Sequence, residues 1–152
     1  MSAGVGPEAN GASADEDHIR LTVPARPEYV RLARLTASSL AARLGFTYDE
    51  IEDLRLAVDE LCFLLVGPGQ GRDGIVSLTF STPHDHDLVG GPALVIVGEG
   101  PVGPQRPHPD SHPQELGELR ELILTALADE YTVSRTSDTV QFRMVTRRRS
   151  RT

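Results

Sequence analysis

The chain has 152 residues, 39% of them hydrophobic, which is enough for one packed core and predicts a single domain. Its 22 acidic residues outnumber its 15 basic ones, and this net charge of -7 argues against a broad nucleic-acid-binding face. The single cysteine, Cys62, excludes an internal disulfide framework and a zinc site built from cysteines. With no membrane-length apolar run and no signal-peptide pattern, we expect a cytoplasmic protein.

The first half of the chain predicts a strand followed by two helices. Residues 1–17 offer almost nothing to bury, so we expect a disordered tail there. Alternating apolar and polar residues over 18–23 predict the strand, and apolar residues at helical spacing over 27–45 predict the first helix. Thr47 and Glu50 have the spacing of a capping box and predict the start of the second helix.

The second half of the chain predicts four strands and one helix. Together with the first half, these elements determine the predicted fold class. The strands are expected near residues 76–80, 93–97, 131–134 and 139–146, the third helix over 114–128, and a long exposed loop over 98–113. This order predicts an α+β two-layer sandwich, with about three helices on one face of a mostly antiparallel sheet of about five strands. The domain is predicted to span 18–147, with a basic tail over 148–152.

One motif in the second helix identifies a family. It is the run Asp53-Leu54-Arg55-Leu56-Ala57-Val58-Asp59-Glu60-Leu61, which follows a helix containing Ala33-Arg34 and precedes Leu127-Ala128-Asp129-Glu130. Together these segments resemble the anti-sigma factors and serine kinases of the histidine-kinase-like ATPase superfamily, whose Bergerat fold is also that of the general-stress and sporulation anti-sigma factors. The resemblance covers nearly all of residues 18–147.

The resemblance implies that the second helix carries the catalytic and magnesium-binding positions. The family motif there is Glu-x-x-x-Asn, in which the glutamate activates the attacking group and the asparagine oxygen binds the magnesium of ATP. Glu60 occupies the glutamate position, but Leu64 stands in place of the asparagine. Magnesium needs oxygen ligands, which leucine does not offer. Glu60 is then either a vestige of the site or an ordinary solvated helix glutamate, and Leu64 is compatible with simple core packing.

Two further nucleotide motifs of the family are degenerate as well. At the Asp-x-Gly-x-Gly motif that reads adenine, Gly98 replaces the aspartate, Gly100 is retained, and Val102 replaces the second glycine. At the glycine-rich lid, Gly117 is retained among carboxylates that would repel a triphosphate, an effect that Arg120 would partly offset. We therefore expect weak or absent ATP binding and no cofactor, with ATP and magnesium required only if the chain is a working kinase.

Other side chains suggest partner surfaces. Arg31, Arg34 and Ser38 form a polar stripe on the first helix, and the resemblance implies that Arg34 lies on the surface that grips the sigma factor and the competing anti-anti-sigma protein. A solvated helix face is the alternative. Leu56 and Phe63 lie opposite the core side of the second helix, and we expect them to be sandwiched between layers rather than to form a partner surface.

The remaining candidate residues are not expected to form a functional site. His84 and His86, and likewise His108 and His112, have ligand-like spacing, but they fall in predicted loops, so we expect solvated side chains and no metal site. The arginine-rich C-terminus is expected to be solvated rather than to bind nucleic acid. Cys62 has no evident histidine or asparagine partner and is expected to be a core residue.

These features together predict an anti-sigma factor that acts by partner switching. It would hold a sigma factor inactive and release it when an anti-anti-sigma protein with a STAS domain competes. The alternative is an active ATP-dependent serine kinase that phosphorylates the anti-anti-sigma factor, with Glu60 aiding transfer. Homodimerisation is common in the family, and contact with nucleic acid or a membrane is not expected. The excess of acidic over basic residues favours binding of a basic partner through complementary charge.

Overall fold

The predicted order of strands and helices is confirmed by the structure, a computed structural model that describes residues 17–67, 69–83, 90–103 and 113–149. It contains β1 (Asp17–Pro24), the short 3-10 helix η1 (Pro27–Tyr29), α1 (Val30–Arg43), α2 (Tyr48–Val66), β2 (Ile75–Thr82), β3 (Ala93–Pro101), α3 (Pro113–Leu127), β4 (Glu130–Arg135) and β5 (Thr139–Arg147).

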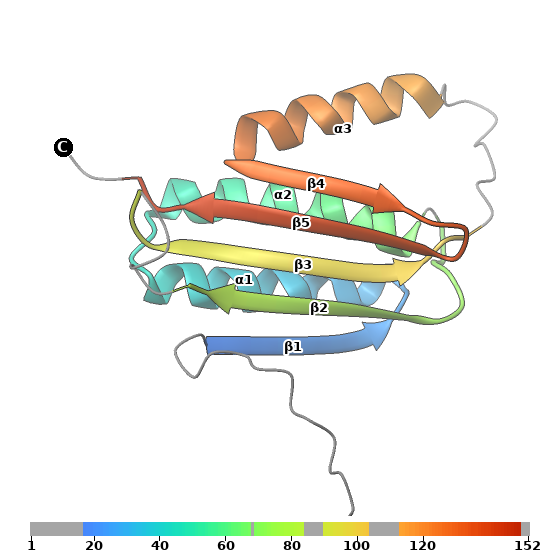
Figure 1. The fold of residues 1–152 in the computed structure, drawn as a ribbon, viewed down its shortest axis with the longest axis horizontal. Helices are drawn as coiled ribbons and strands as arrows, with labels where there is room; N and C mark the ends of the chain where they lie inside the picture. Colours follow the sequence, from blue (N-terminus) through green and yellow to red (C-terminus); the bar gives the residue numbers. More distant parts are fainter. Residues whose placement is uncertain (1–16, 68, 84–89, 104–112, 150–152) are drawn as a thin grey trace, which may run out of the picture.

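The strands form one open antiparallel sheet in the order β1-β2-β3-β5-β4. Figure 1 shows all three helices on the same face of this sheet, and α2 contacts both α1 and α3. The predicted two-layer α+β architecture is therefore confirmed. None of the helices in the described part of the chain is long and apolar enough to cross a membrane.

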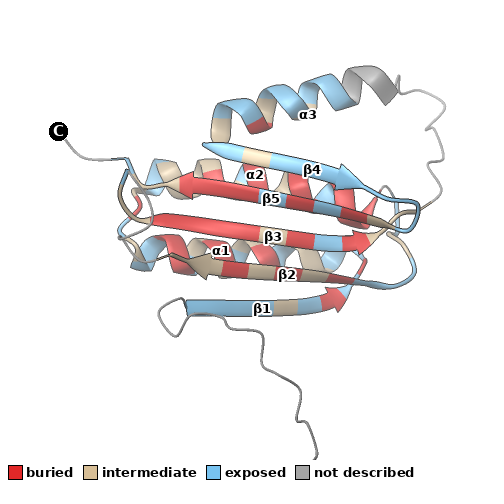
Figure 2. Cartoon of the chain, in the orientation of Figure 1, coloured by how far each residue is buried: buried red, intermediate tan, exposed pale blue. Residues whose placement is uncertain are grey.

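The core lies between the helices and the central strands. Because strand side chains alternate between faces, every second residue of β2, β3 and β5 points toward the helices and is buried. Figure 2 shows this burial along the inner strands and the contrasting exposure of most of β1 and β4 at the sheet edges. The largest buried side chains include Phe80, Phe142, Leu54, Leu61, Leu65, Leu78, Ile96 and Met144.

The start of α2 is fixed by the predicted capping box. The Thr47 backbone N–H donates to Glu50 Oε2 at 2.6 Å, and the Glu50 backbone N–H donates to Thr47 Oγ1 at 3.3 Å. Burial acts to raise the pKa of Glu50, but hydrogen bonds from the backbone of Thr47 and Arg149 outweigh it, so the pKa lies below its ordinary value. The contact therefore stabilises the fold at neutral pH and loses this effect as the pH falls through the acid range.

The strand β3 is longer than predicted, which corrects the expected loop over 98–113. It continues through Gly98 and Gly100 to Pro101, and these residues pair with β5. A Cβ at Gly98 would lie only 2.4 Å from Cε1 of Phe142, so this glycine permits close packing and does not break the strand. Residues 104–112 of the expected loop lie outside the described residues.

The apolar side of α3 is narrower than predicted. Leu124 is buried and Ile123 and Leu127 are half-buried, as expected, but Leu119 is exposed. The helix lies at one edge of the helical layer, where its main contacts are with α2 and β4 (Figure 1). A helix covered from so few sides buries a narrower stripe than its apolar pattern suggests.

Candidate functional site

The structure brings together two predicted site residues from separate motifs. Arg120 of α3 places its Nε 3.5 Å from Oε2 of Glu60 on α2, and each side chain is partly exposed. The contact is an ion pair in which Nε of Arg120 donates no aligned hydrogen bond. The carboxylate expected to activate an attacking group is thus held by a cation of the same chain.

The magnesium position of the family motif is filled by a core side chain. Leu64 is 7% exposed and belongs to the main hydrophobic core. Its side chain presents only carbon atoms, whereas magnesium takes oxygen ligands in near-octahedral geometry. The alternative oxygen nearby, on Asp59, is already paired with Arg34 of α1.

The adenine-reading position has no room for a side chain. Gly98 is buried, and a Cβ built there would lie 2.4 Å and 2.6 Å from ring carbons of Phe142 and 2.8 Å from Cδ2 of Leu78. Contacts below 3.0 Å force neighbouring atoms to move. The adjacent Glu99 is exposed and alternates to the opposite face of the strand, so it does not take the place of the aspartate.

The other two positions of this motif are also packed, Gly100 against α2 and Val102 against the main core. A Cβ at Gly100 would lie 3.2 Å from Cβ of Leu65 on α2. Val102 is half-buried against the main core, and its backbone N–H donates to the carbonyl of Asp138 at 3.0 Å. The end of β3 therefore rests directly on the C-terminal turn of α2.

A residue that the sequence did not single out, Arg72, joins these two segments. Its Nη1 donates to the carbonyls of Leu64 at 3.1 Å and of Pro101 at 3.0 Å, at the ends of α2 and β3. A Cβ at Gly103 would lie 2.5 Å from Arg72 Nε, and one at Gly67 would lie 2.6 Å away. Burial lowers the pKa of Arg72 from its ordinary value. A cation here also complements the negative C-terminal end of the helix dipole.

The retained lid glycine lies inside a helix. Gly117 falls within α3, which begins at Pro113, and nothing lies within 4 Å of a Cβ built at this position. This position agrees with the helix predicted over 114–128, whereas the resemblance matched Gly117 to the glycine-rich lid of the family. Regular helical structure leaves its amide engaged within the helix instead of free to cradle a phosphate.

The polar stripe predicted on α1 is engaged with α2. Nε of Arg34 lies 3.1 Å from Oδ1 of Asp59, and Oγ of Ser38 accepts a hydrogen bond from Nε of Arg55 at 3.0 Å. Burial raises the pKa of Asp59, which the attraction of Arg34 only partly offsets. Arg31 is exposed, and the Arg34 side chain remains 42% exposed. The stripe therefore joins the two helices while still presenting guanidinium groups to solvent.

The prediction that Leu56 and Phe63 are sandwiched between layers is wrong. Leu56 is 56% exposed and Phe63 is 48% exposed. The opposite face of α2 covers the sheet, and no described element packs outside the helical layer (Figure 1). Both side chains therefore form part of the outer surface of α2.

Cys62 is a core residue, as predicted. It is 2% exposed, and burial together with the nearby charge of Asp59 raises its pKa to about 12. The histidines at 84, 86, 108 and 112 lie outside the described residues. Within the residues that the structure describes, no group of three or more potential metal-ligating side chains comes together.

We expect the native protein to resist thiol-specific reagents at pH 8. The thiol of Cys62 is buried and its raised pKa leaves almost no thiolate, which is the reactive form. Reaction with a chromogenic disulfide reagent should then proceed only as fast as the protein opens, and it should become rapid in denaturant. Rapid labelling of the folded protein would show that this helix is not packed as described.

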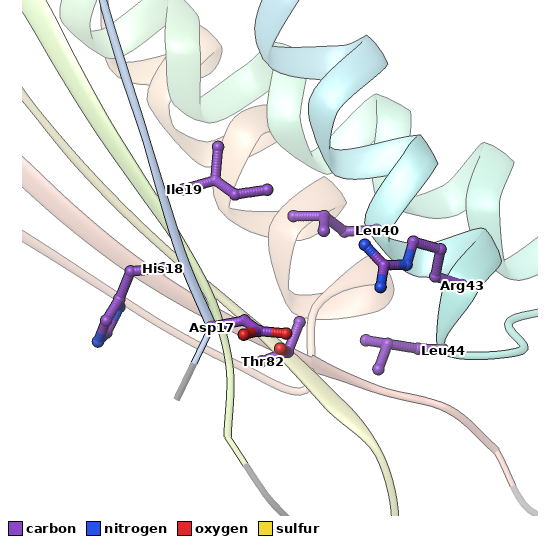
Figure 3. Close-up of a pocket in the computed structure, with 7 residues that line it drawn as sticks. All are labelled: Asp17, His18, Ile19, Leu40, Arg43, Leu44 and Thr82. Carbon is purple, nitrogen blue, oxygen red and sulfur yellow. The ribbon is translucent and has the colours of Figure 1, made fainter. Parts of the chain in front are cut away.

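A shallow hollow lies away from all these positions. Figure 3 shows its lining side chains at the start of β1, the end of β2 and the C-terminal end of α1, with Asp17, Arg43 and Thr82 among them and His18 pointing away. Thr82 ends β2, whereas Arg72 precedes its start, so the hollow is at the other end of the sheet from Arg72. None of the residues at the nucleotide motifs lines it.

Comparison with known proteins identifies the family. Residues 23–146 match the histidine kinase-like ATPase domain. A protein named serine-protein kinase RsbW from Bacillus subtilis (strain 168) is 36% identical over 129 residues, covering 77% of this chain and 78% of that protein.

Two further relatives have the same name and match over shorter stretches. The protein from Bacillus velezensis is 44% identical over 75 residues, covering 48% of this chain and 47% of its own length. The protein from Halalkalibacterium halodurans is 45% identical over 67 residues, covering 44% of this chain and 41% of its own length. Together with the two-layer fold and the position of Glu60 on α2, these matches lead to one conclusion. This chain belongs to the histidine kinase-like ATPase domain family.

Proposed function

We propose that the chain is an anti-sigma factor that works without ATP. It binds a sigma factor in the cytoplasm, keeps it from RNA polymerase, and releases it when an anti-anti-sigma protein competes. The observation that supports independence from nucleotide is that side chains of the protein itself fill the nucleotide motifs. Leu64 occupies the magnesium position, Phe142 closes the space beside Gly98, and Arg72 bridges the ends of α2 and β3.

Release by competition needs no chemistry in this chain. Two partners that bind overlapping surfaces exclude each other, and the ratio of their concentrations to their dissociation constants decides which one is bound. The net charge of -7 favours encounter with a basic, nucleic-acid-binding partner. The resemblance of the motifs to those of the anti-sigma factors supports this class of partner.

The second candidate is an ATP-dependent serine kinase acting on the anti-anti-sigma protein. It is favoured by the name of the relatives, serine-protein kinase, and by the retained carboxylate of Glu60. It requires a magnesium ligand other than residue 64, and the nearest carboxylate on the same helix, Asp59, pairs with Arg34. Homodimerisation, as in the family, is compatible with either function.

Replacing Arg34 with glutamate is expected to weaken capture of the sigma factor about tenfold, which corresponds to about 1.4 kcal/mol. The substitution reverses the charge of a side chain that is 42% exposed at the α1–α2 junction, where the resemblance places the partner surface. A local contact of the guanidinium with the partner is then lost, although the net charge of the chain becomes more negative. Each sigma factor of the same genome would be purified and its affinity measured by surface plasmon resonance.

The matched control is the double variant Arg34→Glu/Asp59→Arg. It restores an ion pair between α1 and α2 while keeping the outer charge of α1 reversed. If both variants bind weakly, the charge of Arg34 acts on the partner. Full recovery in the double variant would mean that Arg34 only holds the helices together, and unchanged affinity in the single variant would remove Arg34 from the interface.

A further inference from the structure

The outer face of α2 carries two exposed apolar side chains in register. Leu56 and Phe63 are seven residues apart, which is about two helical turns or roughly 10 Å along the axis, so they point the same way. Both are about half exposed, and nothing in the described part of the chain covers them. Aromatic side chains surrounded by polar groups are typical of protein interfaces. We refer to this pair as the α2 ridge.

The α2 ridge is bordered by ion pairs on both sides. Glu60 pairs with Arg120 of α3 on one side, and Asp59 pairs with Arg34 of α1 on the other. Arg55, the single basic residue of the helix, pairs with Glu52. The arginines next to the ridge are thus already engaged with carboxylates of α2.

The balance of charge on the helix remains negative. α2 carries six carboxylates and one arginine, a difference of five negative charges. Asp49 and Asp53, in the first two turns, form no ion pair with any other described residue. The ridge therefore lies on a helix whose own net charge is negative, and Asp49 and Asp53 contribute carboxylates that no described cation pairs with.

We propose that the α2 ridge docks an amphipathic helix of a partner protein, with apolar side chains against Leu56 and Phe63 and lysine or arginine side chains facing the carboxylates of α2. Two anchors separated by two helical turns match side chains at positions i and i+7 of a docked helix. The negative charge favours a basic flank on that helix. The inference rests on the proposed function in taking the captured protein as the partner.

Charge also argues against other occupants. A second copy of the chain, docked by a two-fold axis, would oppose one acidic α2 to another, and like charges across an interface are unfavourable. The surface of an anionic membrane, or nucleic acid, would be repelled in the same way. Only a basic partner complements both the apolar ridge and its charged border.

The test uses a synthetic amphipathic helical peptide of leucine and lysine as a defined probe. Fluorescence anisotropy of the labelled peptide would be measured with the full chain and with Leu56→Ser/Phe63→Ser. The matched control is Ile75→Ser/Leu122→Ser, which removes two apolar side chains that are 61% and 69% exposed elsewhere. Circular dichroism and an unchanged melting temperature would show that each variant is folded.

We expect the ridge variant to bind the peptide at least tenfold more weakly than the control variant. We also expect Asp49→Asn/Asp53→Asn to bind several-fold more weakly, and a peptide with glutamate in place of lysine not to bind. Equal binding by the ridge and control variants would overturn the proposal. So would sedimentation showing that the wild type is a dimer and the ridge variant a monomer, or binding of the ridge to anionic lipid vesicles.

The same variants separate this inference from the proposed function. If the wild type captures a purified sigma factor and the ridge variant captures it at least tenfold more weakly, both are supported. If wild type and ridge variant capture it equally, the docking surface is wrong and the anti-sigma function stands. If the wild type captures no sigma factor of its genome, the anti-sigma function fails, and with it the identity of the partner proposed for the ridge.

Discussion

Gly98→Asp, which restores the carboxylate that reads adenine in the family motif, is expected to destabilise the protein by about 3–5 kcal/mol instead of restoring nucleotide binding. The new Cβ would lie 2.4 Å from a ring carbon of Phe142, and the carboxylate would be buried beside Leu78 with no cation to pair with it. Domains of this size have total stabilities of about 5–15 kcal/mol. Urea unfolding followed by circular dichroism measures the loss.

Two further variants serve as controls for Gly98→Asp. Gly117→Asp places the same side chain at an exposed glycine with nothing within 4 Å, and it is expected to change stability by less than about 1 kcal/mol. Gly98→Asp combined with Phe142→Ala removes the obstructing ring, so the two changes should cost less together than their separate effects summed. If Gly98→Asp unfolds at the wild-type urea concentration, the packing of Phe142 against β3 is not as described.

Arg72→Ala is expected to cost about 2–3 kcal/mol of stability. The guanidinium donates to the carbonyls of Leu64 and Pro101, and hydrogen bonds from charged donors contribute about 1.5–3 kcal/mol. Its removal also leaves space beside Gly103 and frees the C-terminal turn of α2 from the end of β3. The unfolding midpoint in urea, compared with the wild type, measures the effect.

The control for Arg72 is Arg20→Ala on β1, where the side chain is exposed and the change is expected to fall within about 0.5 kcal/mol. Arg72→Lys should recover only part of the loss, because a lysine cannot span two carbonyls with a planar fork of donors. Equal stability of the Arg72→Ala and Arg20→Ala variants would show that Arg72 does not join α2 to β3.

The elements that the sequence predicted well are those determined by local pattern. The capping box at Thr47 and Glu50 involves residues three apart, and the alternation of β1 and β2 is visible within each strand. The antiparallel two-layer fold follows from their order and from the resemblance of the second helix. Each of these signals lies within a short window of sequence.

The features that were missed depend on contacts between distant segments. Gly98 suggests a loop until Phe142 of β5 is known to need its space. Arg72 lies in a glycine-rich turn without a motif, and its acceptor Pro101 is 29 residues away. Leu119 is exposed because α3 lies at an edge, which its own apolar pattern does not reveal.

The sequence predicted which residues stand at the motif positions of the candidate site, but not which side chains these residues contact. The sequence placed Glu60 and Leu64 at the glutamate and asparagine positions of the family motif, but it could not show that Arg120 would reach Glu60. It treated Arg34 as a surface residue, whereas the structure pairs it with Asp59. Side-chain partners on different helices are determined by packing, which a single sequence does not display.

The central claim, an anti-sigma factor that works without nucleotide, is tested most directly by calorimetric titration of the full chain with ATP and ADP, with and without magnesium. We expect no binding heat up to millimolar nucleotide, because Leu64 offers no ligand at the magnesium position of the family motif and Phe142 leaves no room for a side chain at Gly98. Micromolar, magnesium-dependent binding of ATP would contradict the claim and would make the serine kinase the leading function.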